Sequence, residues 1–142
     1  MRENSVKILG KDYLGQILQL TKQLNPTLTS SELESRQLQM FEFENYTCFG
    51  LFEDEVLIGV ASGWITVRLY SDRQLEIDNF VIDSDLQSNG YGKLFITEIE
   101  LWAKANNCKT VELNTYVQND RSHKFYFNKG YRILGFHFQK KF

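Results

Sequence analysis

The segment 87–93 has the residue types of a turn that binds an anion. It reads Gln-Ser-Asn-Gly-Tyr-Gly-Lys, follows the apolar run Phe80-Val81-Ile82 and precedes a helical pattern. Gly90 and Gly92 have no Cβ, so successive backbone N–H groups can approach a negatively charged group closely. The N-terminus of the following helix adds the positive end of its dipole. A pyrophosphate group is the natural ligand of such a turn.

Two glycines at a strand-to-helix turn also occur where the chain only has to bend, so this turn does not specify a ligand by itself. It differs from the dinucleotide-binding pattern G-x-G-x-x-G, because Phe95 stands where the third glycine would be. It differs from the phosphate loop of nucleoside triphosphatases, because Lys93 is followed by Leu94. The sequence therefore disfavours both of these nucleotide-binding classes.

A second group of polar side chains lies on a predicted short helix near the C-terminus. Ser122 and Tyr126 stand four residues apart and so share one helix face. Asn119 precedes this helix and Gly130 follows it. These side chains could contact one ligand, but aromatic packing of residues 125–127 with a glycine as helix stop explains the pattern equally well.

Hydrophobic periodicity predicts the elements that position these residues. Strands are expected at 6–9, 46–52, 56–69, 74–82 and 110–115, with one or two more within 131–142, and helices at 11–24, from 30 or 31 to 40, 90–107 and 120–129. This order predicts one α/β domain over residues 1–142, with an antiparallel first half and a parallel crossover through the helix 90–107.

Three local signals refine the predicted elements. Residues 53–55 form a polar turn suited to a hairpin between antiparallel strands. Ser31 and Glu34 are spaced as in a capping box at the start of the second helix. Gly130 is expected to be the left-handed residue that ends the last helix.

Composition excludes several classes of function. The 142 residues carry a formal net charge of -2, from 16 basic and 18 acidic residues spread along the chain, so nucleic acid is not an expected partner. Cys48 and Cys108 lack metal-ligand spacing and are interpreted as buried thiols; no metal site is expected. No apolar segment approaches the roughly 20 residues that cross a bilayer, and no signal-peptide core follows the N-terminus, so no membrane partner and a cytoplasmic location are expected.

Together the two polar segments resemble the GCN5-related N-acetyltransferase (GNAT) superfamily. The pyrophosphate turn of that family reads Arg/Gln-x-x-Gly-x-Gly/Ala, and a second family element reads Asn-x-x-Ala-x-x-x-Tyr-x-x-x-Gly-Phe. The order of the predicted elements is also similar to this fold over almost the whole chain. The matching residues are Gln87, Gly90 and Gly92 in the turn and Asn119, Tyr126 and Gly130 in the second element, while Ser122 and Tyr131 depart from the pattern.

The resemblance implies a GNAT-like α/β (α+β) fold, with a mixed sheet of about six or seven strands, splayed at the central strands, and about four helices. It implies acetyl-CoA as the acetyl donor and an amine as the acceptor, with a strand backbone bonding the pantetheine arm and the turn amides holding the pyrophosphate. The acetyl-CoA-binding residues that it implies are Phe80, Val81, Ile82, Gln87, Ser88, Asn89, Gly90, Tyr91, Gly92, Lys93, Asn119, Ser122 and Tyr126.

A transfer of this kind needs a base and an acid. An amine is mostly protonated at neutral pH, so a carboxylate must take a proton before the nitrogen attacks the thioester. Glu76 and Asp78 are the candidates, with a slight preference for Asp78, and either could instead be a solvated strand carboxylate. By its family position Tyr126 would protonate the leaving thiolate. No arrangement of nucleophile and base argues for a covalent acyl-enzyme.

The acceptor remains open among several classes. Glu32, Glu34, Glu42 and Glu44 accompany Phe41, Phe43 and Tyr46, and an acidic, aromatic-lined pocket would favour a cationic small-molecule amine. The alternatives are a protein or peptide N-acetyltransferase, a non-catalytic acyl-CoA-binding module on the same fold, and a nucleotide-phosphate binder of unrelated fold. Either a monomer or a homodimer is compatible with the sequence.

Overall fold

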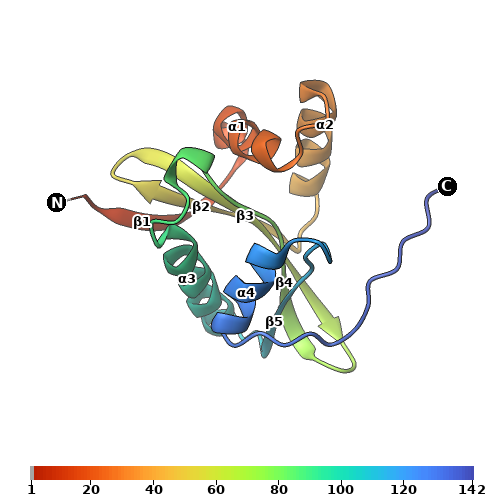
Figure 1. Cartoon of the computed structure of the whole chain (residues 1–142). Helices are drawn as coiled ribbons and strands as arrows, with labels where there is room; N and C mark the ends of the chain where they lie inside the picture. Colours follow the sequence, from red (N-terminus) through yellow and green to blue (C-terminus); the bar gives the residue numbers. More distant parts are fainter. Residues whose placement is uncertain (1) are drawn as a thin grey trace. The chain divides into compact units, whose positions relative to one another are not determined.

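The computed structural model describes residues 2–142, in which five strands and four α-helices form (Figure 1). The chain divides into two compact units, a first unit that ends at Glu112 and a second unit, Leu113–Phe142, and each is described by itself. The expectation of one domain over residues 1–142 stays a prediction. In chain order the elements are β1 (Asn4–Leu9), η1 (Lys11–Tyr13), α1 (Leu14–Leu24), α2 (Ser30–Phe41), β2 (Tyr46–Glu53), β3 (Val56–Arg68), β4 (Asp72–Ile82), η2 (Ser84–Leu86), α3 (Tyr91–Ala105), β5 (Thr110–Leu113) and α4 (Asp120–Asn128).

The five strands form one sheet in the order β1-β2-β3-β4-β5. The pairs β1–β2, β2–β3 and β3–β4 are antiparallel, which confirms the predicted hairpin between β2 and β3. Asp54 in its turn has a φ of 55°, in the left-handed region that aspartate tolerates better than most residues. β5 follows the α3 crossover and lies beside β4, with the Lys109 N–H donating to the Arg73 carbonyl at 2.6 Å.

One face of the sheet is covered by α1 and α2 (Figure 1). Ile17 and Leu20 of α1 are buried in a cluster with Cys48 of β2, Val60 of β3 and Val81 of β4. Burying an aliphatic side chain of this size contributes about 1.5–3 kcal/mol, so this cluster fixes the helix on the sheet. The side chain of Val81 therefore lies on the face of β4 that packs against α1.

The opposite face is covered by α3. Trp102 lies 4.9 Å, between ring centroids, from Phe49 of β2, and Phe95 lies 5.3 Å from Phe80 of β4. Successive residues of a strand point to opposite faces, so Phe49 and its neighbour Cys48 serve different helix layers. The buried positions of α3 are Phe95, Ile96, Ile99 and Ala103, at the spacing of one helix face.

The capping box of α2 lies two residues before the predicted one. Thr29 is the N-cap and accepts a hydrogen bond from the Glu32 N–H at 3.1 Å, while the Glu32 carboxylate accepts from the Thr29 N–H at 3.0 Å. The predicted pair of Ser31 and Glu34 is wrong, because α2 already begins at Ser30 and Ser31 is helical. Both pairs have the same spacing, so the sequence pattern could not separate them.

The predicted strands within 131–142 do not form, so the sheet has five strands instead of the expected six or seven. This segment alternates apolar and polar residues, with Leu134, Phe136 and Phe138 on one side, and these side chains are exposed. A strand requires a neighbouring strand to take up its N–H and C=O groups. Alternation predicts a strand but does not supply its partner, and this is why the prediction failed.

Candidate cofactor and acceptor sites

The start of α3 presents free backbone donors. Gly90 is the N-cap, with a φ of 82° that a residue with a Cβ adopts only under strain. The first bond of the helix runs from the Leu94 N–H to the Gly90 carbonyl at 3.2 Å. The N–H groups of Tyr91, Gly92 and Lys93 therefore have no acceptor within the helix. Three adjacent donors at the positive end of a helix dipole suit an anion such as a pyrophosphate.

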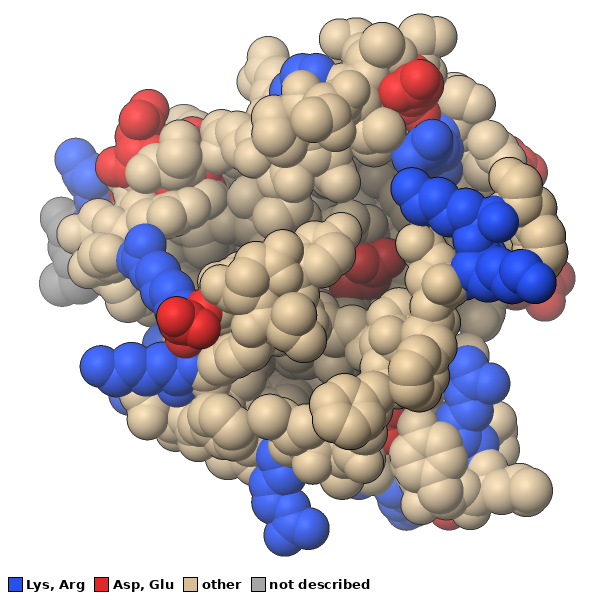
Figure 2. Space-filling model, turned by 45° about the vertical axis from the view of Figure 1, so that its right-hand side comes forward, with Lys and Arg blue, Asp and Glu red and all other residues tan. Residues whose placement is uncertain are grey.

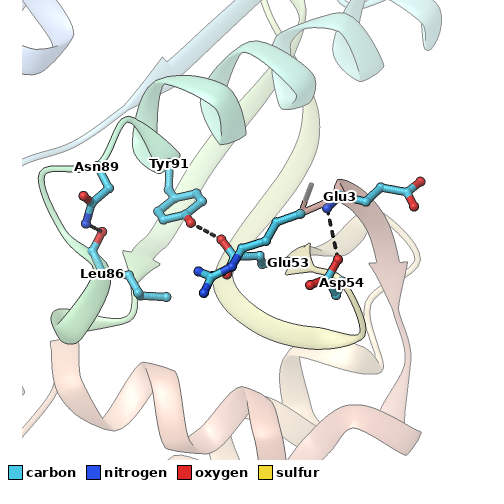
Figure 3. Close-up of polar contacts among 7 residues, drawn as sticks. Glu3, Glu53, Asp54, Leu86, Asn89 and Tyr91 are labelled. Carbon is cyan, nitrogen blue, oxygen red and sulfur yellow. Dashed lines mark hydrogen bonds and ion pairs between the residues drawn. The ribbon is translucent and has the colours of Figure 1, made fainter.

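The turn before α3 is held in shape by its own side chains. The Asn89 side-chain amide donates to the Leu86 carbonyl at 3.0 Å (Figure 3). The same amide also donates to the Gln87 carbonyl at 3.2 Å. The Gln87 amide donates to the Ile82 carbonyl at 3.4 Å, which ties the turn to the end of β4. Ser88 has a φ of 69°, so the turn contains two left-handed residues, Ser88 and Gly90. A turn built in this way is ordered before any ligand binds.

The end of β4 carries a bulge. Val81 pairs with Val60 and Asp78 pairs with Ser62, so two residues of β4, Asn79 and Phe80, oppose a single residue of β3. Asn79 has a φ of 52°, the left-handed geometry that asparagine tolerates better than most residues. The bulge bends β4 immediately before the run Phe80-Val81-Ile82.

That run extends past the last strand of the sheet. β5 has four residues and begins beside Arg73, whereas β4 continues to Ile82. At about 3.3 Å per residue in both strands, β5 ends before it reaches Phe80. The β5-facing edge of Val81 and Ile82 therefore lies beyond the ladder, at the end of β4 that leads into the anion-binding turn. An extended ligand could pair with this edge as a further strand does.

The two candidate carboxylates share one face of β4. Glu76 pairs with Trp64 and Asp78 pairs with Ser62, and both precede the bulge, so the strand is regular between them. Asp78 is exposed, and its Oδ1 accepts from the Asn79 N–H at 2.9 Å, which stabilises the bulge. Glu76 is half-buried. The described residues offer Glu76 no hydrogen bond or ion pair, so its carboxylate is available to a ligand.

Beside Asp78 lies a buried chain of polar side chains that sequence reasoning missed. The Gln37 amide of α2 donates to the Tyr46 hydroxyl at 2.8 Å, and that hydroxyl lies 2.8 Å from the Ser62 Oγ. Gln37 is 3% exposed and Ser62 is 1% exposed. Burial raises the pKa of Tyr46, so its phenol stays protonated. The chain fixes α2 over the face that carries the carboxylates.

Cys48 belongs to the same face and is not a nucleophile at neutral pH. Burial raises the pKa of its thiol to about 11, so the thiolate is scarce. Cys108 is also buried, and both cysteines are free, which confirms their interpretation as buried thiols.

Trp64 is the second feature that sequence reasoning missed. Its ring centroid lies 4.8 Å from that of Tyr46 and 5.6 Å from that of Phe43. As the cross-strand partner of Glu76 it shares that carboxylate's face. The sequence places Trp64 on a strand, but only the register of β3 against β4 brings it opposite Glu76. An aromatic ring beside a carboxylate is an arrangement that binds cationic amines.

The four glutamates expected around the acceptor do not line the cavity of this face. A cavity of about 140 Å³ lies between α1, α2 and the β4 bulge, and its lining contains Arg36, Gln37 and Asn79 but no glutamate. Glu32 belongs to the capping box, and Glu42 pairs with Lys11 at 3.1 Å on the surface. The acidic pocket expected from α2 stays a prediction, and Glu76 and Asp78 add two carboxylates on the face of β4 that carries their partners Trp64 and Ser62.

The second unit holds the remaining predicted residues, Asn119, Ser122 and Tyr126. Asn119 is the N-cap of α4, and its side chain accepts from the Ser122 N–H at 3.2 Å. Gly130 follows the helix with a φ of 90°, which confirms it as the left-handed residue after the helix. The Tyr131 N–H donates to the Tyr126 carbonyl at 3.0 Å. Asn119 and Gly130 of this motif thus have local structural roles at the two ends of α4.

The Tyr126 side chain is fixed by aromatic contacts within this unit. Its ring packs edge-on against Phe125 at 5.0 Å and against Tyr131 at 5.5 Å. Burial raises the pKa of Tyr126 to about 12, so the phenol is fully protonated at neutral pH and can serve as a proton donor. His123, by contrast, contacts the Tyr116 carbonyl at 2.9 Å through its Nε2, which gives it a structural partner.

Charge is distributed without a dominant sign. In the view of Figure 2, most basic side chains stand along the margins of a mostly uncharged face, and acidic groups lie both at the margins and near the centre. Among residues 2–142, no group of three or more His, Cys, Asp or Glu side chains is arranged to hold a metal ion. In the same part of the chain, no helix has the length and apolar character that crossing a membrane requires.

Comparison with known proteins gives matches to acetyltransferases. Residues 16–131 match the acetyltransferase (GNAT) family. The chain is 28% identical over 98 residues to the uncharacterized N-acetyltransferase YhdJ of Bacillus subtilis (strain 168), a match that covers 68% of this chain and 69% of that protein.

Solved structures share the fold over nearly the whole chain. An aminoglycoside N-acetyltransferase, AAC(6')-Iy in complex with CoA, has a TM-score of 0.85 at 18% identity, covering 99% of this chain and 96% of that chain. A putative acetyltransferase from Agrobacterium tumefaciens str. C58 has a TM-score of 0.82 at 25% identity, covering 96% of this chain and 99% of that chain. These matches confirm the α/β fold class that the resemblance implied.

Proposed function

The chain belongs to the acetyltransferase (GNAT) family and is an acetyl-CoA-dependent acyltransferase, and we propose that its acceptor is the primary amine of a small cationic molecule. The observation that carries this proposal is the half-buried Glu76 opposite Trp64 in the sheet, whose carboxylate has no hydrogen-bond or ion-pair partner among the described residues. A carboxylate and an aromatic face together attract an ammonium group, and the carboxylate can then accept its proton.

Residues of the first unit would hold the acetyl donor. Acetyl-CoA supplies the acetyl thioester. The N–H groups of Tyr91, Gly92 and Lys93 would bind its pyrophosphate, because they are the free donors at the start of α3. The backbone of Phe80-Val81-Ile82 would bond the pantetheine arm, as the family resemblance implies. The other residues of the turn, Gln87, Ser88, Asn89 and Gly90, would fix the positions of these amides.

Glu76 would act as the base. An ammonium group bound beside Trp64 has to lose a proton before its nitrogen can attack a carbonyl carbon, and Glu76 would accept it directly or through one water. The sequence slightly favours Asp78, but the carboxylate of Asp78 already accepts the Asn79 N–H and stabilises the bulge. We therefore assign the proton transfer to Glu76. To Asp78 we assign a structural role, the stabilisation of the bulge in β4.

Tyr126 would act as the acid. Its phenol remains protonated at neutral pH and could deliver a proton to the departing sulfur. Asn119, the N-cap of α4, and Ser122, which stands where the family motif has alanine, would contact the cofactor as well. No covalent acyl-enzyme is required, since the buried thiol of Cys48 is protonated and the amine can attack directly.

A panel of acceptors tests the proposal. The protein is incubated with acetyl-CoA and with diamines, amino sugars, aminoglycosides or peptides that carry a free N-terminus or a lysine, and mass spectrometry identifies the acetylated products. We expect acetylated diamines or amino sugars and no acetylated peptide. Acetylation of peptides alone would contradict the small-molecule acceptor, and acetylation of no amine would favour a binding module on the same fold.

A further inference from the structure

A carboxylate outside the turn contacts it directly. The hydroxyl of Tyr91 donates to the Glu53 Oε2, and the Arg2 Nη1 donates to the Glu53 Oε1 at 3.0 Å (Figure 3). Tyr91 is the first residue of α3 and lies between the two glycines of the turn. The hydrogen bond to Glu53 raises the pKa of Tyr91, so its phenol stays protonated and remains the donor.

Glu53 is itself well anchored. It is the last residue of β2, and the next residue, Asp54, exchanges two hydrogen bonds with Glu3 just before β1. The Asp54 N–H donates to the Glu3 carbonyl at 2.6 Å, and the Glu3 N–H donates to the Asp54 Oδ1 at 3.0 Å. The Glu53 side chain is 13% exposed. The hairpin end between β2 and β3 is thus a fixed point from which Glu53 reaches the turn.

Glu53 is negatively charged, whereas a site that binds an anion is favoured by positive charge. A carboxylate close to a turn that holds a pyrophosphate would repel it, so Glu53 does not serve to attract the ligand. Arg2 compensates this charge through the ion pair with Oε1, although its own side chain is 74% exposed. The hydrogen bond to Tyr91 of the turn explains why a carboxylate lies at position 53. The ion pair explains Arg2, which neutralises the charge of that carboxylate.

We propose that Glu53 is a positioning residue that holds Tyr91 and thereby the N–H groups of Tyr91, Gly92 and Lys93 in register for the pyrophosphate of CoA, with Arg2 neutralising its charge. This inference rests on the proposed function of the turn. It adds the turn after β2 and the segment before β1 to the cofactor site, although neither belongs to the family motif.

Pantetheine lacks the pyrophosphate of CoA. Comparing the binding of the two ligands therefore distinguishes a specific effect of Glu53 on the pyrophosphate site from a general effect on the stability of the fold. Calorimetry measures both dissociation constants for the full chain and for Tyr91→Phe and Glu53→Ala. We expect each variant to raise the dissociation constant for CoA about three- to tenfold, the net effect of losing one typical hydrogen bond, and to leave that for pantetheine unchanged. The KM for acetyl-CoA should rise more than kcat falls.

Tyr70→Phe is the matched control. The Tyr70 hydroxyl donates to the Glu112 Oε1 at 2.7 Å, a second tyrosine–glutamate bond in the same unit but outside the turn. This variant should bind CoA as the wild type does. CoA binding by Tyr91→Phe equal to that of the wild type would overturn the inference, as would an equal loss of pantetheine binding. A wild type that binds CoA no more tightly than pantetheine would contradict the proposed function of the turn itself.

The variant Arg2→Ala tests whether Arg2 neutralises the charge of Glu53. At low salt it should raise the dissociation constant for CoA about two- to fivefold, the range of an exposed ion pair, and added salt should reduce that effect. Glu53→Gln in the Arg2→Ala background removes the uncompensated charge and should recover part of the loss. A double variant that binds CoA more weakly than Arg2→Ala alone would overturn the role of Arg2 in neutralising Glu53.

Discussion

At the scale of single residues, the candidate site contains two kinds of side chain. Some make structural hydrogen bonds, and others are available for the reaction. Asp78 bonds the bulge at Asn79, and Asn119 caps α4. Glu76 and the phenol of Tyr126 remain available, one as a carboxylate and the other as a protonated acid. Family position points to several residues, and the hydrogen bonds favour Glu76 over its neighbour Asp78 as the proposed base.

Replacing Glu76 should lower the rate of transfer more than replacing Asp78. We expect Glu76→Gln to reduce kcat about 100-fold or more, because general base catalysis contributes at least that factor, while the KM for acetyl-CoA stays close to its wild-type value. Steady-state kinetics of thiol release measure both constants. Asp78→Asn keeps an oxygen that can accept the Asn79 N–H, and a larger loss of kcat in this variant than in Glu76→Gln would contradict the assignment.

The raised pKa of Tyr126 predicts the shape of the pH profile. The acid form is present below its pKa of about 12, so loss of the Tyr126 proton should not reduce kcat at any pH up to about 10. An unperturbed tyrosine would instead begin to lose activity near pH 9–10. A descending limb below pH 10 in the wild type that disappears in Tyr126→Phe would show that the phenol titrates in the ordinary range.

At the scale of elements, hydrophobic period predicted the strands and helices where a long apolar face had to be buried. The α3 pattern and the strands β2, β3 and β4 are examples, because each lies against a buried core that imposes its period. The prediction failed in segment 131–142, where alternation is present but no neighbouring strand is. It also missed the cap Thr29, since two equally spaced cap pairs compete within one short segment.

Features that depend on register could not be read from the sequence. The bulge at Asn79 exists only because β4 has one residue more than β3 between two paired positions. The same register brings Trp64 opposite Glu76, and the hairpin end brings Glu53 to Tyr91. The motif predicted which residues form the turn. It could not predict what holds the turn, because those contacts join residues far apart in the chain.

Gly90 should be required for its backbone conformation. With a φ of 82° and no atom within 4 Å of a Cβ built on it, the position has space for a side chain but strains its backbone. Gly90→Ala should therefore lower the free energy of unfolding by about 1–2 kcal/mol and weaken CoA binding. Denaturant unfolding and calorimetry measure the two effects.

Gly15→Ala is the control for this substitution. Gly15 lies within α1 and also has no atom within 4 Å of an added Cβ, but its φ is not positive. Alanine there should raise the free energy of unfolding by about 0.5–1 kcal/mol and leave CoA binding unchanged. Equal behaviour of the two alanine variants would show that the left-handed conformation of Gly90 is not needed.

At the scale of the whole molecule, the account depends on preferential binding of CoA to the folded chain. A ligand at 100 times its dissociation constant stabilises the native state by about 2.7 kcal/mol, so CoA should raise the thermal midpoint by several degrees. ATP lacks the pantetheine arm that the end of β4 would bond and should raise it much less. Equal shifts with ATP and CoA, measured by thermal unfolding, would favour a binder of nucleotide phosphates.

The composition excludes some classes of partner but does not indicate the acceptor. The class of acceptor is proposed from the face of the sheet that carries Glu76 and Trp64. A net charge of -2 and a cavity lined partly by Arg36 do not themselves select an amine. The cross-strand pair of carboxylate and indole supports the proposed amine, because it combines attraction of a cation with a group that can take its proton. This pair is the structural reason for preferring a cationic acceptor over a neutral one.

Acceptor-dependent release of free thiol from acetyl-CoA tests the central claim most directly. A thiol-reactive dye follows the reaction of the wild-type protein with acetyl-CoA, first without any amine and then with increasing concentrations of a diamine or an amino sugar. The account predicts almost no release without an acceptor and a saturable rate with one. Tight CoA binding without acceptor-dependent release across all amines would contradict an acetyltransferase and indicate a module that only binds the cofactor.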